Sequence, residues 1–220
     1  MVDKSNEYGY VPSSPTQARG SNTGIFEVND VTDLLAAKQW SGDFGKLELI
    51  ETKTASADSF IDFTSLGSYN VHFITGNDIN MSANNQFFRA RLSNDGGSSF
   101  ITSATQERAG MRMLTTGSFG DTRSTTDTFF GHYLTDNSGG YGTTADNGNF
   151  YLYCYNLLDS SKYSFCTSHS TGLEQSSSTY SAMFGSGTLP TAETHNAIRF
   201  LNSSTGTFSG TLSLYGIAES

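Results

Sequence analysis

Four histidines are the side chains of this sequence with the widest chemical range: His72, His132, His169 and His195. Histidine binds zinc when three or four ligands converge on one ion. These residues lie far apart in the sequence, and none belongs to a His-Glu-x-x-His motif. A metal site would need the fold to gather several of them beside a carboxylate. The spacing favours ordinary packed or surface histidines instead.

Aspartates beside turn residues are the candidates for acid–base chemistry: Asp58, Asp62, Asp78 and Asp95. Hydrolysis of a glycoside needs two carboxyl groups about 5–10 Å apart in a cleft, and no spacing singles out a pair. Aspartates at turns commonly bond the local backbone. The sequence also lacks a phosphate-binding loop and a Gly-x-Ser-x-Gly motif. We therefore expect a non-enzymatic protein that holds no cofactor.

The stretch over residues 135–149 is the best candidate for a ligand or partner loop. Its carboxylates and amides offer the oxygen ligands that calcium prefers, although their spacing is not that of an EF-hand. The alternative is a long loop whose Asx side chains form turns. A tyrosine at the tip could contact a partner or a sugar. The candidate residues are Asp136, Asn137, Tyr141, Asp146 and Asn147.

Tyrosines alternate with apolar residues at positions 150–155. Alternation along a strand puts the two sets on opposite faces: Phe150, Leu152 and Cys154 against Tyr151, Tyr153 and Tyr155. One row must face the core. If the tyrosines are outside, they form an aromatic strip suited to an interface or to stacking on sugars. The alternative is that both rows are buried.

The two cysteines, Cys154 and Cys166, lie on consecutive predicted strands joined by a turn at residues 158–161. This hairpin would place the two thiols opposite each other, and a disulfide needs Cα atoms about 5.5 Å apart. Because the sequence shows no export signal, we expect reduced, buried thiols that pack as small apolar residues.

The composition favours strands over helices. Glycine occurs 23 times, phenylalanine 16 times and tyrosine 11 times among 220 residues, and only 15% of the residues are charged. Short alternating segments separated by Gly, Asn, Asp and Ser turns predict an all-β fold, an antiparallel jelly-roll-like β-sandwich over residues 46–220. The strands are expected at residues 46–53, 59–64, 69–75, 86–93, 100–106, 128–135, 149–156, 162–169, 179–185, 195–202 and 207–217. Residues 107–127 are ambiguous in the sequence, with a strand possible near 111–114.

The strand at residues 86–93 shows the alternation most clearly. Phe88, Ala90 and Leu92 are expected to face inward, and Arg89 and Arg91 outward. The turn that follows, Asn94-Asp-Gly-Gly97, is typical of a hairpin because these residues tolerate positive φ.

Residues 1–45 differ from the rest and predict an extended docking arm. Its prolines favour extended backbone, and a short helix over residues 30–39 can be capped by Asn29 or Asp30. Such an arm has no core of its own and must lie on its own domain, a sister subunit or another protein. The alternative is a disordered tail. The anchoring residues are Tyr8, Tyr10, Val11, Pro12, Pro15, Phe26 and Trp40.

The formal charge is −9, with 21 acidic against 12 basic residues. Nucleic-acid phosphates require clustered Lys and Arg, so no nucleic acid is expected as a partner. The sequence shows neither a signal peptide nor an apolar stretch long enough to span a bilayer. We expect synthesis in the cytoplasm, no membrane partner, and exit only by lysis or within a larger particle.

Several motifs, in this order, resemble those of virion proteins from marine tailed bacteriophages, cyanophages among them. The motifs are Tyr8-Gly-Tyr-Val-Pro-Ser-Ser-Pro-Thr-Gln17, Gly20-Ser-Asn-Thr-Gly-Ile-Phe26, Gln39-Trp40, Leu47-Glu-Leu-Ile-Glu-Thr52, Ile61-Asp-Phe-Thr64, Tyr69-Asn-Val-His-Phe73, Arg91-Leu-Ser-Asn-Asp-Gly-Gly97, Asp159-Ser-Ser-Lys-Tyr163, Asn196-Ala-Ile-Arg-Phe200 and Ser209-Gly-Thr-Leu-Ser-Leu-Tyr-Gly216.

The resemblance implies a structural component of the virion with a jelly-roll-like domain, and it supplies no catalytic residues. We expect a tail fibre or appendage, made in the host cytoplasm, whose arm docks onto other virion proteins; a homotrimer is the favoured oligomer. The alternatives are a head decoration protein and a carbohydrate-binding module that recognises a host-surface glycan.

Overall fold

The computed structural model describes residues 46–82, 86–137, 147–174 and 179–218. The described residues form twelve strands. Their bounds are β1 Leu47–Asp58, β2 Phe60–Phe63, β3 Val71–Met81, β4 Gln86–Ser93, β5 Gln106–Leu114, β6 Phe119–Asp127, β7 Phe130–Asn137, β8 Gly148–Tyr155, β9 Ser164–Glu174, β10 Thr179–Leu189, β11 Ala197–Asn202 and β12 Phe208–Ile217. The strands belong to one compact unit, Leu47–Ile217.

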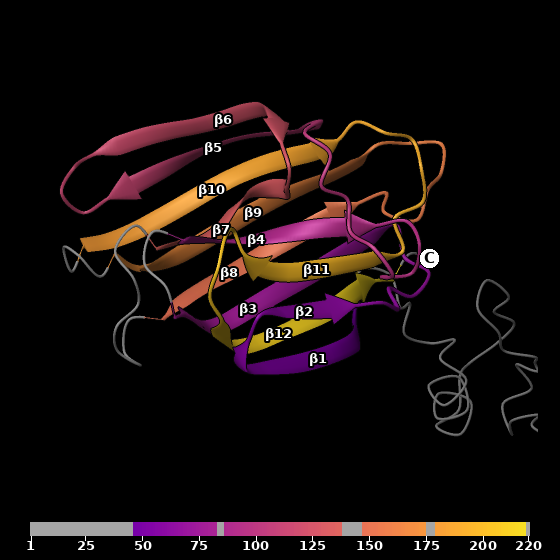
Figure 1. The fold of residues 1–220 in the computed structure, drawn as a ribbon, viewed down its shortest axis with the longest axis horizontal. Coiled ribbons are helices and arrows are strands. Elements are labelled where there is room, and N and C mark those ends of the chain that lie inside the picture. Colours follow the sequence, from indigo (N-terminus) through magenta and orange to yellow (C-terminus); the bar gives the residue numbers. More distant parts are fainter. Residues whose placement is uncertain (1–45, 83–85, 138–146, 175–178, 219–220) are drawn as a thin grey trace, which may run out of the picture. The chain divides into compact units, whose positions relative to one another are not determined.

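The strands form two antiparallel sheets that pack face to face (Figure 1). One sheet has eight strands in the order β1-β12-β3-β8-β9-β10-β5-β6, and the other has four in the order β2-β11-β4-β7. The antiparallel pairing is nested, so that each early strand pairs with a later one: β1 with β12, β2 with β11, β3 with β8 and β4 with β7. A long hairpin rolled up in this way is a jelly roll, so the predicted fold class is confirmed.

Two hairpins are added to the eight strands of the roll. The β5–β6 hairpin lies between β4 and β7 in sequence, and β9–β10 lies between β8 and β11. The added hairpins pair with each other through β10 and β5, which lengthens one sheet to eight strands. Strand β7 contacts β9, β10 and β5 on the inner side of this extension.

Close contact between β7 and the extension depends on glycine. Gly187 on β10 lies so near β7 that an added Cβ would stand 2.6 Å from the Cα of Gly131. Gly131 itself has φ of +82°, a conformation that side-chain-bearing residues rarely adopt. The backbones can therefore approach without side chains between them.

Aromatic rings fill the centre of the sandwich. Phe88 lies 4.7 Å from Phe208 and 6.1 Å from Phe200, measured between ring centroids. All three side chains are buried. The inward positions predicted for Phe88, Ala90 and Leu92 are confirmed, since none of the three is exposed.

Arg89, which lies between Phe88 and Ala90 and was predicted to face outward, is buried instead. Only 3% of Arg89 is accessible, because residues 127–129 cover it. Its guanidinium stacks on Phe129 and Tyr133 and donates to Asp127 at 2.9 Å. Four arginines that are scattered in sequence each lie over an aromatic ring in the fold: Arg89, Arg91, Arg108 and Arg199.

The prediction for residues 100–106 is wrong. Strand β5 begins only at Gln106, and Phe100 instead lies 4.0 Å below the guanidinium of Arg199. The turn at residues 94–97 forms as predicted, with Gly96 and Gly97 at positive φ. It leads into an irregular segment rather than a second strand of a hairpin. Strand β6 was not predicted.

The cysteines are free, buried and opposite each other in the β8–β9 register, as the sequence predicts. Burial raises the pKa of Cys166 to about 12 and also raises the pKa of Cys154. We expect no reaction of either thiol with Ellman's reagent in the native protein at neutral pH and two equivalents after unfolding, because the reagent needs a thiolate. Rapid native labelling would contradict the buried placement.

Candidate functional site

The tyrosines of β8 lie on the outer face of the eight-stranded sheet. Phe150, Leu152 and Cys154 are buried, whereas Tyr151 is 42% exposed. Tyr153 and Tyr155 are partly exposed on the same face. Of the two arrangements that the sequence left open, the structure has the one with an outward aromatic row.

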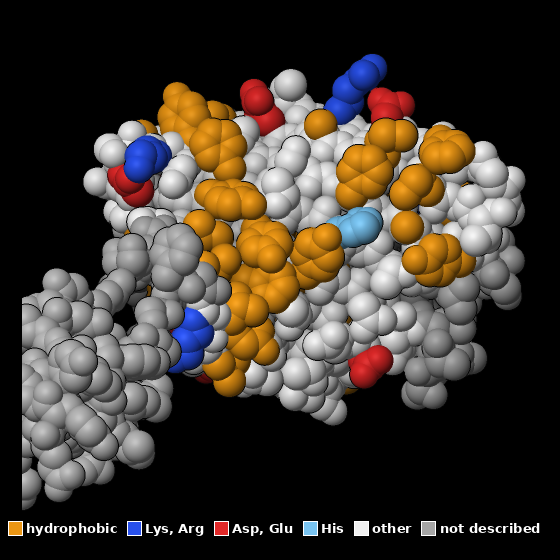
Figure 2. Space-filling model, turned by 180° about the vertical axis from the view of Figure 1, so that it is seen from behind, with side chains coloured by type: hydrophobic (Ala, Val, Ile, Leu, Met, Phe, Trp, Pro, Cys, Tyr) orange, Lys and Arg blue, Asp and Glu red, His pale blue; other side chains and the backbone are white. Residues whose placement is uncertain are grey.

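Rings from neighbouring strands join this row into an aromatic surface (Figure 2). Phe73 on β3 lies 4.7 Å from Tyr153 and 6.1 Å from Tyr215 of β12, centroid to centroid. Tyr151 continues the surface to His169 on β9 at 5.6 Å, and its hydroxyl lies 3.1 Å from His169 Nδ1. An exposed aromatic surface on a folded domain commonly marks a binding site.

A trough lies beside this surface, on the extension of the sheet. Its floor is a cross-strand row of small, exposed residues: Thr167 on β9, Ser186 on β10 and Ala109 on β5. Tyr153 on β8 and Arg123 on β6 continue the same register at the two ends. We call these three small residues the floor row.

Two rows of larger side chains flank the floor row. The first wall is His169, Phe184 and Met111, which are cross-strand partners on β9, β10 and β5. The second wall is Phe165, Thr188 and Glu107. Phe165 and Phe184 are each 44% exposed, so both rings are accessible from the trough.

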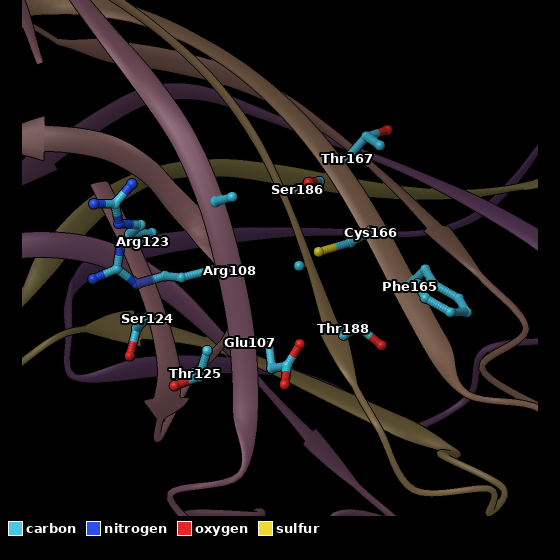
Figure 3. Close-up of a pocket in the computed structure, with 12 residues that line it drawn as sticks. Glu107, Arg108, Arg123, Ser124, Thr125, Phe165, Cys166, Thr167, Ser186 and Thr188 are labelled. Atoms are coloured by element: carbon cyan, nitrogen blue, oxygen red, sulfur yellow. The ribbon is translucent and has the colours of Figure 1, made fainter. Parts of the chain in front are cut away.

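The trough contains two adjoining hollows of about 750 and 590 Å³. Both are lined by Ala109, Arg123, Thr167 and Ser186, and the described lining residues all belong to β5, β6, β9 and β10. In Figure 3, the β6 residues lie at one side of the larger hollow and those of β9 at the other. The four strands added to the jelly roll therefore build the whole trough.

The central strands of this face carry almost no charge. The sequences of β8 and β10 contain no Asp, Glu, Lys or Arg, and β9 contains none before Glu174. Glu107 and Arg123 stand at the margin of the trough. On a chain of net charge −9, this face is locally close to neutral.

The other histidines are interior residues. His72, His132 and His195 are at most 1% exposed. Burial lowers the pKa of all three; for His132 it does so to about 4, with Arg108 adding to the effect. Among the residues that the structure describes, no group of three or more His, Cys, Asp and Glu is placed to hold a metal ion.

The aspartates singled out in the sequence have separate structural partners. Asp62 makes a bidentate ion pair with Arg199, with both N–O distances at 2.7 Å. Asp95 accepts from Ser99 and Ser93 at its turn, and these hydrogen bonds lower its pKa to about 2. Asp58 accepts from Ser56 N, and Asp78 has φ of +55°. The structure does not bring them together as a pair.

The predicted partner loop is described only at its two ends. Asp136 and Asn137 are the last residues of β7, and Asn147 accepts a 2.9 Å hydrogen bond from Asn80. Tyr141 and Asp146 lie outside the described residues. The anchoring residues of the arm and the helix at residues 30–39 lie outside them too.

Comparisons with protein-family models, curated proteins and solved structures found no match. No helix in the described part of the chain has the length and apolar character that crossing a membrane requires. The fold and this site must therefore carry the functional argument.

Proposed function

We propose that this chain is a non-enzymatic structural protein of a bacteriophage virion, of the tail fibre or appendage type. On this proposal, residues 1–45 dock onto other virion proteins and the jelly roll presents the outer face of its larger sheet to the surroundings. The observation that carries the proposal is the exposed, nearly uncharged aromatic face on a jelly roll. Side chains of this kind are costly to leave in water and are typical of a surface that meets a partner.

The arrangement of polar groups also supports a non-enzymatic role. The buried histidines make hydrogen bonds inside the domain. His195, for example, has its Nδ1 2.7 Å from Ser164 Oγ and its Nε2 3.2 Å from Glu193 Oε1. The most buried carboxylate–arginine cluster, Asp127 with Arg89 and Arg108, packs under aromatic rings. Of these groups only Arg108 lines a hollow of the trough, and its guanidinium is held by Asp127.

The test is the copy number of the protein in purified particles. Replacing Tyr8, Tyr10 and Trp40 together with serine should lower incorporation at least about tenfold, because buried aromatic anchors dominate docking interfaces. Tyr163→Ser is the matched control, since this tyrosine is on the body and 46% exposed. It should leave incorporation unchanged.

Full incorporation of the arm variant, or absence of the wild-type protein from the particles, would contradict the proposal. Imaging of the same particles distinguishes a tail appendage from a head decoration protein. Light scattering of the free protein tests the expected homotrimer.

A further inference from the structure

We infer that the trough across β9, β10, β5 and β6 binds an extended, uncharged glycan chain. The inference deepens the proposed function, on which it rests, by naming the partner class that the presented face recognises. It concerns the floor row and its two walls, and it involves no residue of the arm.

The shape of the trough fits a linear ligand. The walls stand four residues apart along each strand, from Phe165 to His169 on β9 and from Thr188 to Phe184 on β10, which is about 13 Å at the usual strand rise. The floor row crosses three strands, or about 10 Å at the usual strand spacing, and the register reaches about 14 Å when Arg123 on β6 is included. A single chain lying across the strands, between the walls, matches this form.

The chemistry of the trough fits sugar rings. Phe165 and Phe184 face the channel from opposite walls, and aromatic rings supply rigid apolar surface for the C–H faces of a sugar. Between them, Thr167 and Ser186 supply hydroxyl groups that can both donate and accept. Thr188, in the second wall, donates its hydroxyl to Ser164 O at 3.0 Å and can still accept. Alternation of apolar and hydroxyl surface over a few ångströms matches the alternation on a pyranose chain.

The charge of the face selects the class of glycan. A polyanionic polysaccharide would need several free Lys or Arg side chains. The two arginines that line the trough are Arg123, which lies beside Glu107 and Asp121, and Arg108, which is already paired with Asp127. The net charge of −9 would also repel it. An uncharged ligand suits this face, because the central strands of the face carry almost no charged side chains.

The same features argue against the other occupants. The core of an interface between copies is apolar and tightly packed, whereas the middle of this face is a hollowed, hydroxyl-bearing channel. A second sheet would rest on the walls and leave the floor row unfilled, because packed sheets lie about 10 Å apart. A glycan chain reaches the floor.

The experiment is affinity electrophoresis of the full chain through native gels that contain one polysaccharide each. The probes are four neutral polysaccharides, namely hydroxyethyl cellulose, a mixed-linkage β-glucan, a galactomannan and dextran, with alginate as the acidic contrast. We expect retardation by at least one neutral probe and none by alginate. Phe165→Ala and Phe184→Ala should each weaken the retarded complex about fivefold, as expected for loss of an aromatic contact.

Two further variants separate the trough from the rest of the surface. Ser186→Trp fills the floor and should abolish retardation, whereas Ser186→Ala should keep it. Phe119→Ala is the matched control, because this ring is 69% exposed and lies outside both hollows. Unchanged thermal unfolding of each variant shows that the fold is intact.

Lack of retardation by all four neutral probes overturns the inference, as does equal retardation of wild type and Ser186→Trp. A change in oligomeric state caused by Ser186→Trp would assign the face to a second copy, and displacement of the glycan by a peptide of residues 1–45 would assign it to the arm. Particle incorporation is measured separately, so a failed glycan test leaves the proposed virion role standing.

Discussion

Replacing Asp127 with asparagine should lower the free energy of unfolding by about 3–5 kcal/mol, because it leaves two buried arginines without their counter-ion. The Asp127 carboxylate accepts from Arg108 Nε and from Arg89 at 2.9 Å. Its other oxygen accepts from the backbone N–H groups of Thr128 and Phe129. Burial alone would raise the pKa of Asp127, but the two guanidinium groups outweigh it and hold the pKa below its usual value.

Urea denaturation at pH 7 measures this effect. The matched control is Asp121→Asn on the same strand, where the carboxylate is 70% exposed and meets Arg123 at 3.5 Å. A surface substitution of this kind should change stability by less than about 0.5 kcal/mol. Adding Arg89→Met to the Asp127→Asn variant should recover part of the loss, because it removes one uncompensated charge. Equal stabilities of the two single variants would contradict the buried cluster.

Acidification from about pH 7 to 4.5 should destabilise the protein by about 2–3 kcal/mol through His132 alone. Its ring lies between β7 and the extension, so near the backbone that a Cβ on Gly185 would stand 2.4 Å from it. Because burial lowers the pKa of His132 to about 4, the unfolded chain, with a pKa near 6.5, binds the proton first. The stabilisation that depends on neutral His132 is therefore fully present above about pH 6.5 and is lost as the pH falls toward 4.

The charged groups around His132 act in both directions. Arg108 and Arg89 lower its pKa, and Asp127 raises it. His72 and His195 have pKa values lowered by burial as well and add to the same acid sensitivity. His132→Gln should flatten the dependence of unfolding free energy on pH. An unaltered slope in His132→Gln would show that this imidazole is not the titrating group.

The sequence was informative where a strand has one buried face. Alternation predicted β4 with its observed bounds, and it placed Phe88, Ala90 and Leu92 in the core. It was misleading for Arg89, because its burial depends on residues 127–129, which alternation within β4 cannot reveal. The prediction of a strand at residues 100–106 was wrong, because the Phe100 ring packs against the guanidinium of Arg199 instead of lying in a strand of the sheet.

The candidate site was only half visible in the sequence. The tyrosine row of β8 was recognised, but the trough also depends on β5, β6 and β10. Strands β6 and β10 are rich in Gly, Ser and Thr, and β5 interrupts its apolar residues with Arg108 and Arg112, so the apolar pattern is weak. Its floor becomes a row only when Thr167, Ser186 and Ala109 are brought into register by pairing between separate insertions. The signal that could have indicated it is the lack of charge in β8 and β10.

The seam between β10 and β5 joins two insertions that are distant along the chain. Neither hairpin can change its length or register by itself without breaking the channel, so the two are expected to vary together among related chains. The rolled framework of eight strands is free of that constraint. New recognition properties can then arise by exchanging a matched pair of hairpins while the underlying scaffold stays as it is.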